Sequence, residues 1–251
     1  MTTEEMVVDV SQDWVLACDV QQAFMQAPCT TNDFLDYSAR CRQIRALGGD
    51  CYHFISLKSD RLALFVGDAS GKGLAAALVI ASVQSSLRTA ALFTGDDLAA
   101  LLRAVNHQAY SSSLPNRYAT LFYGLFDSTK RTLRYINAGH NPAAVLRRHG
   151  SVEWLETGGA PVGMFPDWIY EERVVELETG DLVIAYTDGV VEATNQNGEE
   201  WGVQGLLKAA GYGAQRSRNA GDLVNSILDS MDDFSQGHQT DDATLAVVRA
   251  I

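Results

Sequence analysis

The chain has 251 residues, and its 31 acidic against 19 basic side chains give a formal net charge of −12. This balance argues against nucleic-acid and anionic-membrane partners, because both need clustered Lys and Arg. Hydrophobic residues make up 47% and charged residues 20%, which excludes disorder over most of the length. The N-terminus has no basic region followed by an apolar signal core, so we expect a cytoplasmic protein.

The predicted elements begin with a helix over residues 11–28, closed by Pro28. No repeat or Pro/Gly/Ser-rich linker divides the rest of the chain. We therefore expect an N-terminal helical segment over residues 1–30 and one folded domain over residues 31–251.

Further along, the hydrophobic pattern predicts groups of strands and groups of helices. Because strands and helices do not alternate, a parallel doubly wound sheet is disfavoured, and mostly antiparallel sheets flanked by helices fit better. The expected class is α+β. The predicted strands are 52–57, 61–67, 119–127, 131–137, 143–148, 170–178, 181–187 and 243–249, and the predicted helices are 74–92, one after Gly95-Asp96-Asp97, 203–210 and 220–233.

Four aspartates lie where predicted strands begin or end. Asp50 and Asp68 are equally far from Ser59 at the hairpin turn, so an antiparallel hairpin brings them to one end. Asp188 follows one apolar strand and Asp241 precedes the last, so these two also share an end if the strands are antiparallel neighbours. The alternative is four separate helix caps or turn residues.

Carboxylates gathered at one point repel one another unless a cation neutralises them. Glycines beside each aspartate let backbone carbonyls approach an ion closely. Carboxylate and carbonyl oxygens are ligands that suit Mg²⁺ or Mn²⁺.

The cysteines do not indicate a metal site. No Cys-x-x-Cys pair is present, so a zinc cage is unexpected. The four cysteines are interpreted as reduced thiols, with Cys51 in a structural role.

The loop Gly67-Asp68-Ala69-Ser70-Gly71-Lys72-Gly73 invites a nucleotide-binding interpretation. It fails the P-loop pattern, because Val66 and Gly73 occupy required positions. It meets only a relaxed dinucleotide pattern, and Asp68 would repel a pyrophosphate. Lys72 at a helix start could contact a substrate phosphate or be a solvated surface lysine.

Two further groups have both a catalytic and a local interpretation. His140 could act as a general acid, although a hydrogen-bonded turn histidine is the more common case. Glu192, on the turn after Asp188, could lie near the carboxylates or make only local hydrogen bonds.

Six short segments together resemble the SpoIIE/RsbU-type bacterial phosphatases, a branch of the metal-dependent type 2C (PPM) serine/threonine phosphatases. The resemblance runs in order from about residue 15 to residue 250. The segments are Gly48-Gly49-Asp50, Gly67-Asp68-Ala69-Ser70-Gly71-Lys72-Gly73, Asn137-Ala138-Gly139-His140-Asn141-Pro142, Gly159-Ala160-Pro161-Val162-Gly163, Tyr186-Thr187-Asp188-Gly189-Val190 and Asp241-Asp242-Ala243-Thr244-Leu245.

This resemblance implies an αββα sandwich with two Mn²⁺ or Mg²⁺ ions at the sheet edge. It implies that Asp50, Asp68 and the Ala69 carbonyl hold the metals and that Asp188 and Asp241 complete the site. Asp242 matches the position beside a ligand. A metal-bound hydroxide would attack the phosphate directly, in keeping with the lack of a Gly-x-Ser-x-Gly nucleophile motif.

Two residues depart from the family pattern. His53 stands where relatives usually carry Asp, and Cys51 replaces the usual aromatic. His53 could alter an outer contact of the metal site or face elsewhere. The resemblance also suggests that the N-terminal helix relays signals or dimerises, so a regulator would be another protein or a second copy of this chain.

The leading hypothesis is a protein phosphatase that removes phosphate from phosphoserine or phosphothreonine. The resemblance suggests an anti-sigma-factor antagonist (STAS) protein as its substrate. One alternative is a catalytically weak binding module that sequesters a signalling partner. Another is a metal-dependent phosphoesterase acting on a small metabolite.

Overall fold

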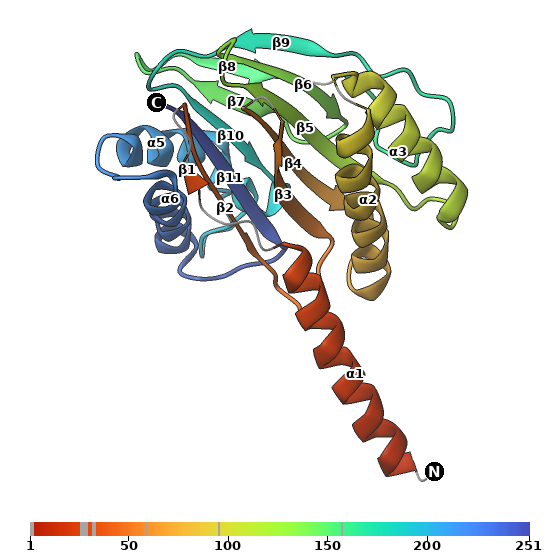
Figure 1. Cartoon of the computed structure of the whole chain (residues 1–251). Helices are drawn as coiled ribbons and strands as arrows, with labels where there is room; N and C mark the ends of the chain where they lie inside the picture. The colour runs from red at the N-terminus through yellow and green to blue at the C-terminus, as the bar shows by residue number, and fades with distance from the viewer. Residues whose placement is uncertain (1–2, 26–29, 32–33, 59, 95, 157) are drawn as a thin grey trace.

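Eleven strands form two sheets in the computed structural model, which describes residues 3–25, 30–31, 34–58, 60–94, 96–156 and 158–251 (Figure 1). Every pairing between these strands is antiparallel, so the expected α+β class is confirmed. The six-stranded sheet has the order β1 (Thr30–Thr31), β2 (Leu35–Arg42), β11 (Ala243–Ala250), β10 (Leu182–Tyr186), β7 (Ala143–Leu146) and β8 (Val152–Leu155). The five-stranded sheet has the order β3 (Asp50–Leu57), β4 (Arg61–Ala69), β5 (Ala119–Asp127), β6 (Thr132–Ala138) and β9 (Arg173–Glu176).

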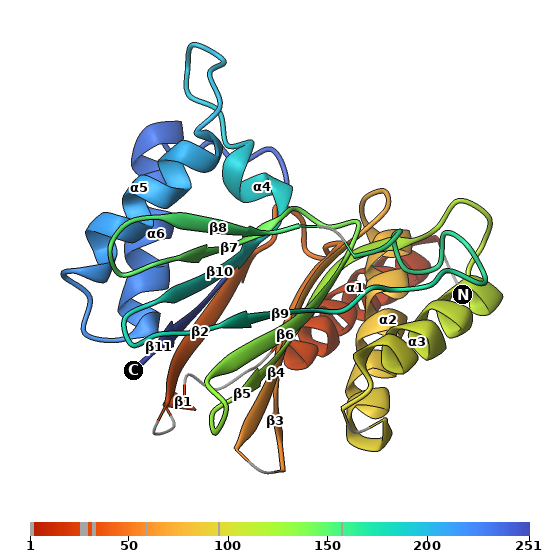
Figure 2. The ribbon, with the colours of Figure 1, turned by 90° about the horizontal axis from the view of Figure 1, so that it is seen from above.

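Helices cover the outer faces of both sheets (Figure 2). Helices α2 (Leu74–Phe93) and α3 (Leu98–Ser112) lie on the five-stranded sheet, and α5 (Gly202–Ala214) and α6 (Ala220–Ser235) lie on the six-stranded sheet. The short helix α4 (Asp188–Val191) follows β10 directly. The layers are therefore helix, sheet, sheet and helix, as the αββα expectation states.

Three apolar layers hold these elements together. Leu64 and Phe122 from one sheet meet Val183 from the other in the central layer. The alternation of side chains along each strand gives each sheet a second apolar face. Phe65 packs under α2 on one side, and Ile184 packs under α6 on the other.

Several elements differ from the sequence expectation. The N-terminal helix α1 spans Thr3–Phe24 rather than 11–28, and Pro28 lies outside the described residues. Residues 3–10 contain no Pro or Gly, so the sequence gives no signal that would stop a helix before residue 11. Strand β2, beside β11, was not predicted, because its sequence mixes polar and apolar residues. The strand expected over 170–178 is shorter, as β9.

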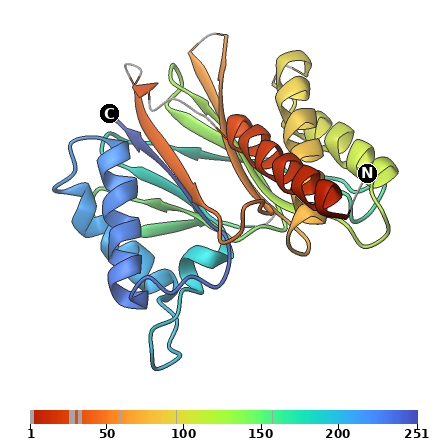
Figure 3. The same ribbon diagram turned by 90° about the horizontal axis from the view of Figure 1, so that it is seen from below.

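Helix α1 projects away from the two sheets, with its C-terminal part beside α2 (Figures 1 and 3). An apolar groove of about 270 Å³ lies between these helices, and Leu16 and Leu78 on its walls are 60% and 65% exposed. By length and composition alone, α2 could cross a membrane. Buried core helices meet the same criteria, and α2 packs on the sheet through residues such as Ile80 and Leu87.

Candidate active site

Asp50 and Asp68 face each other across the first hairpin. Asp50 opens β3, Asp68 lies near the end of β4, and the two are direct partners in the antiparallel register. Asp50 lies two residues before Tyr52, and Asp68 lies two residues after Val66, so each shares a strand face with that residue. Tyr52 and Val66 belong to the central layer, so both aspartate side chains lie on the face toward the other sheet. The hairpin geometry expected from the sequence is therefore present.

Asp50 is also bonded to the opposite sheet. Its Oδ2 accepts hydrogen bonds of 2.7 Å from Thr187 Oγ1 and 2.7 Å from Thr244 Oγ1. Thr187 directly follows β10, Thr244 is the second residue of β11, and Thr187 N donates a 3.0 Å hydrogen bond to the Thr244 carbonyl. Sequence reasoning gave these threonines no role, although both lie inside the segments Tyr186-Thr187-Asp188 and Ala243-Thr244-Leu245.

Asp188 and Asp241 reach the same end from the six-stranded sheet. Strands β10 and β11 are antiparallel neighbours, with Tyr186 opposite Leu245. Asp188 follows β10 as the first residue of α4, and Asp241 precedes β11. A Cβ added at Gly189 would lie 2.0 Å from the Asp242 carbonyl oxygen, so only glycine permits this close approach.

Ala69, the last residue of β4, brings its backbone oxygen to this end. Ala69 N donates a 3.0 Å hydrogen bond to the Gly49 carbonyl. A Cβ added at Gly49 would lie 3.1 Å from Asp68 Oδ1 and 3.3 Å from the Ala69 carbonyl oxygen. The missing side chain at Gly49 therefore leaves both oxygens uncovered on that side.

The charges of these carboxylates act on one another. Burial raises the pKa of Asp68 to about 7, and repulsion from Asp188, Asp241 and Asp242 adds to the rise. Burial, followed by the charge of Asp68, also raises the pKa of Asp50 well above its usual range. Burial and mutual repulsion therefore disfavour the charged form of both carboxyl groups in the absence of a cation.

Lys72 brings a positive charge to this site. Its Nζ lies 2.5 Å from Asp241 Oδ2, and this hydrogen bond is the main cause of a raised Lys72 pKa. The side chain is half exposed, so the ion pair contributes little stability. Lys72 bonds to a carboxylate of the site, and its side chain stays accessible to solvent.

Asp242 has a local structural role. Its Oδ1 accepts a 2.8 Å hydrogen bond from Ile44 N, and its Oδ2 accepts a 3.0 Å bond from Gly49 N. These bonds tie the residue beside Asp241 to the loop that carries Asp50. Glu192 lies close enough for Asp188 to contribute to its raised pKa, although burial contributes more.

Among the described residues, none of His140, Cys51 and His53 forms a side-chain hydrogen bond with the four carboxylates. His140 is buried, its Nδ1 lies 2.8 Å from Thr120 Oγ1, and burial lowers its pKa to about 4. Cys51 is buried, and burial raises the pKa of its thiol, which opposes a thiolate role. His53 alternates with Asp50 along β3, stacks on Phe65 and lies against α2. It therefore faces away from Asp50.

The oxygen atoms of these aspartates and of the Ala69 carbonyl are chemically suited to bind a divalent cation that prefers oxygen ligands. Asp50 Oδ1 accepts no hydrogen bond from the described residues, and Asp68 faces three repelling carboxylates. Mg²⁺ and Mn²⁺ prefer such carboxylate and carbonyl oxygens. Within the described part of the chain, however, no three His, Cys, Asp or Glu side chains are grouped as ligands of one metal ion.

The arrangement of two antiparallel sheets between helices defines the PP2C-like fold. The SiaA-PP2C domain of Pseudomonas aeruginosa superimposes with a TM-score of 0.81 over 99% of both chains, at 18% identity. Two further solved structures of this fold are described as RsbX in complex with magnesium (TM-score 0.66, 15% identity) and the catalytic domain of the serine threonine protein phosphatase PstP in complex with 2 manganese ions (TM-score 0.63, 17% identity).

Sequence comparison then gives the family. Residues 58–251 match the family described as Stage II sporulation protein E (SpoIIE). This chain belongs to the SpoIIE family of PP2C-type serine phosphatases. Phosphoserine phosphatase RsbU of Bacillus subtilis is 26% identical over 96% of this chain and 71% of its own length. Protein IcfG of Synechocystis sp. is 28% identical over 91% of this chain, which spans only 40% of that protein.

Proposed function

We propose that this chain is a metal-dependent protein phosphatase that hydrolyses phosphoserine or phosphothreonine. The observation that carries the proposal is the convergence of Asp50 and Asp68 from one sheet with Asp188 and Asp241 from the other. Membership of a serine phosphatase family supports the same reaction.

Asp50, Asp68, Asp188, Asp241 and the Ala69 carbonyl would hold two Mn²⁺ or Mg²⁺ ions. When bound, such ions lower the pKa of water and neutralise phosphoryl oxygens. Thr187 and Thr244 orient Asp50 through its Oδ2, so that Oδ1 stays available. Binding of a cation by Asp241 would release Lys72, whose ammonium group could then contact the substrate phosphate.

The substrate we propose is a phosphorylated STAS-domain anti-sigma-factor antagonist. The similarity to RsbU, a phosphoserine phosphatase, supports a phosphoserine target, and the STAS domain is what the family resemblance suggests. We also propose that α1 contacts a regulator protein or a second copy of this chain. The exposed apolar residues Leu16, Val20 and Leu78 beside the α1–α2 groove support that contact.

Hydrolysis of p-nitrophenyl phosphate tests the reaction. Turnover should require Mn²⁺, disappear in EDTA and fall by about 100-fold or more in Asp188→Asn, as expected for loss of charge stabilisation at a reacting centre. Asp167→Asn is the matched control, because Asp167 is exposed in a loop and bonds to no described residue. Its rate should equal that of the wild type.

The assay is repeated with a STAS protein that carries phosphoserine. If folded protein shows no Mn²⁺-dependent turnover of either substrate, the proposal is contradicted and a binding module is favoured. Comparing a phosphoserine peptide with small phosphate esters as substrates distinguishes a protein phosphatase from a phosphoesterase that acts on a small metabolite. A higher kcat/KM for the small esters would indicate a metabolite phosphoesterase.

A further inference from the structure

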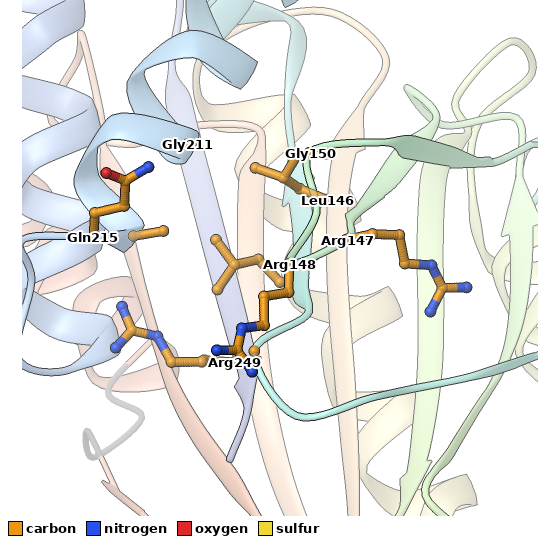
Figure 4. Close-up of a pocket in the computed structure, with 10 residues that line it drawn as sticks. Leu146, Arg147, Arg148, Gly150, Gly211, Gln215 and Arg249 are labelled. Carbon is orange, nitrogen blue, oxygen red and sulfur yellow. The ribbon is translucent and has the colours of Figure 1, made fainter.

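A second cavity lies at the opposite end of the six-stranded sheet from the carboxylates. Its volume is about 430 Å³. Figure 4 shows the residues that line it. Leu182 begins β10 and Arg249 lies near the end of β11, and the two are partners in the register. The same strands carry Asp188 and Asp241 at their other ends. The cavity is therefore separate from the candidate active site.

Two guanidinium groups enter this cavity. Arg249 Nη1 donates a 3.3 Å hydrogen bond to the Ser217 carbonyl, whereas its Nη2 is buried and has no hydrogen-bond partner among the described residues. The stem of Arg148 packs against Gly180, where an added Cβ would lie 2.9 Å from Arg148 Cδ. No ion pair or side-chain hydrogen bond holds the Arg148 guanidinium within the described chain. A buried donor without an acceptor costs free energy, which an anion would recover.

The neighbouring Arg147 differs from these two arginines. Its side chain points away from the cavity and pairs with Asp181 at 2.7 Å and with Glu153. Asp181 also accepts hydrogen bonds from Arg148 N and Glu178 N. Its hydrogen bonds within the described chain therefore go to Arg147 and to backbone N–H groups, and none goes to the guanidinium group of Arg148 or Arg249.

The rest of the lining is apolar or neutral. Leu146, Leu182 and Ala214 supply apolar walls, and Gln215 adds an amide whose side chain bonds to no described residue. No Asp or Glu lines the cavity, although the chain has 31 acidic and 19 basic side chains. This local charge is opposite to that of the protein as a whole, so the cavity would attract an anion.

We propose that this cavity binds a small phosphate monoester with an apolar or planar group attached to the phosphate. Guanidinium groups bind phosphate oxygens in a bidentate fork, and the apolar walls accept the remainder of the molecule. The volume lies within the usual range of small-molecule sites. The proposal does not depend on the reaction at the carboxylates.

Calorimetric titration of the EDTA-treated full chain with AMP tests the proposal. Without metal, the carboxylates of the candidate active site repel phosphate, so binding reports on the second cavity. AMP should bind saturably, inorganic phosphate more weakly, and adenosine not at all. Arg148→Gln and Arg249→Gln should each weaken AMP binding by about tenfold or more, the effect of losing a charge-assisted contact.

Arg216→Gln is the matched control. Arg216 lies near the end of α5, stacks over the Tyr212 ring at 5.1 Å and does not line the cavity. AMP affinity should be unchanged in this variant. If Arg249→Gln does not fold, as judged by circular dichroism, Arg148→Gln decides, because its guanidinium holds no other element.

Three results would overturn the proposal. They are no saturable AMP binding at millimolar concentration, equal binding by adenosine, and equal affinity in wild type and Arg148→Gln.

Discussion

Thr244 on one sheet donates a 2.7 Å hydrogen bond to Asp50 on the other, at a point where both side chains are buried. We expect Thr244→Val to lower the free energy of unfolding by about 1–3 kcal/mol, because it removes a donor from a buried carboxylate without changing side-chain shape. The same change should weaken Mn²⁺ binding, since Asp50 would lose one of the bonds that orient it. Urea unfolding and calorimetry measure the two effects.

Thr132→Val serves as the control for this substitution. Thr132 begins β6, is partly exposed and makes no side-chain hydrogen bond within the described chain. The free energy of unfolding of the Thr132→Val variant should differ from that of the wild type by less than about 0.5 kcal/mol. A similar loss in both variants would mean that the Thr244–Asp50 bond contributes nothing specific.

The metal-free protein should lose stability as the pH rises from about 4 to about 7. The pKa of Asp68 is raised from 3.8 to about 7, so the folded state holds this proton more tightly than the unfolded chain. The contribution of this proton to the free energy of unfolding is fully present below about pH 4. It is lost as the pH rises through the folded-state pKa of about 7. Thermal unfolding in EDTA at pH 5 and pH 7.5 measures this loss of stability. Each kcal/mol should lower the Tm by roughly 2–4 °C.

Asp68→Asn should flatten that dependence, because the amide does not titrate. Mn²⁺ should raise the Tm of the wild type more at pH 7.5 than at pH 5, since it competes with the proton for the carboxylates. An identical fall of Tm with pH in wild type and Asp68→Asn would refute the assignment to Asp68.

Lys72→Gln should have opposite effects on cation and substrate. Without the Lys72–Asp241 ion pair, Mn²⁺ should bind about threefold tighter or more, because a repelling and competing ammonium is gone. The KM for a phosphate ester should rise if Lys72 contacts the substrate. Calorimetry and steady-state kinetics measure these effects, and Lys72→Arg should resemble the wild type in both. Weaker Mn²⁺ binding in Lys72→Gln would contradict the expected competition.

Gly189→Ala should destabilise the fold by about 1–3 kcal/mol or more, because the new methyl group would overlap the Asp242 carbonyl oxygen at 2.0 Å. Gly211→Ala is the comparison, since its Cβ would meet nothing closer than Leu146 at 4.0 Å within a helix. That variant should be neutral or up to about 1 kcal/mol more stable. Urea unfolding of both variants checks the prediction, and a wild-type midpoint for Gly189→Ala would count against this packing.

The amino-acid sequence by itself determined the fold class, the first hairpin and the order of the site motifs. The hairpin could be predicted because its two aspartates are equally distant from a local turn, so strand alternation alone pairs them. Helix α2 could be predicted for a similar reason, since its apolar spacing is a local pattern. Strand β2 could not, because its mixed polarity gives no clear period and its pairing partner β11 lies about 200 residues away.

Only the tertiary structure decided how the two halves of the site meet. The bonds from Thr187 and Thr244 to Asp50 join residues far apart in the chain, and no local pattern encodes such a contact. The face of β3 on which His53 lies, and the cavity that the Arg148 and Arg249 side chains line together, likewise follow from packing between sheets and helices. Burial and long-range charge, which shift the pKa of Asp68, exist only once the sheets have come together.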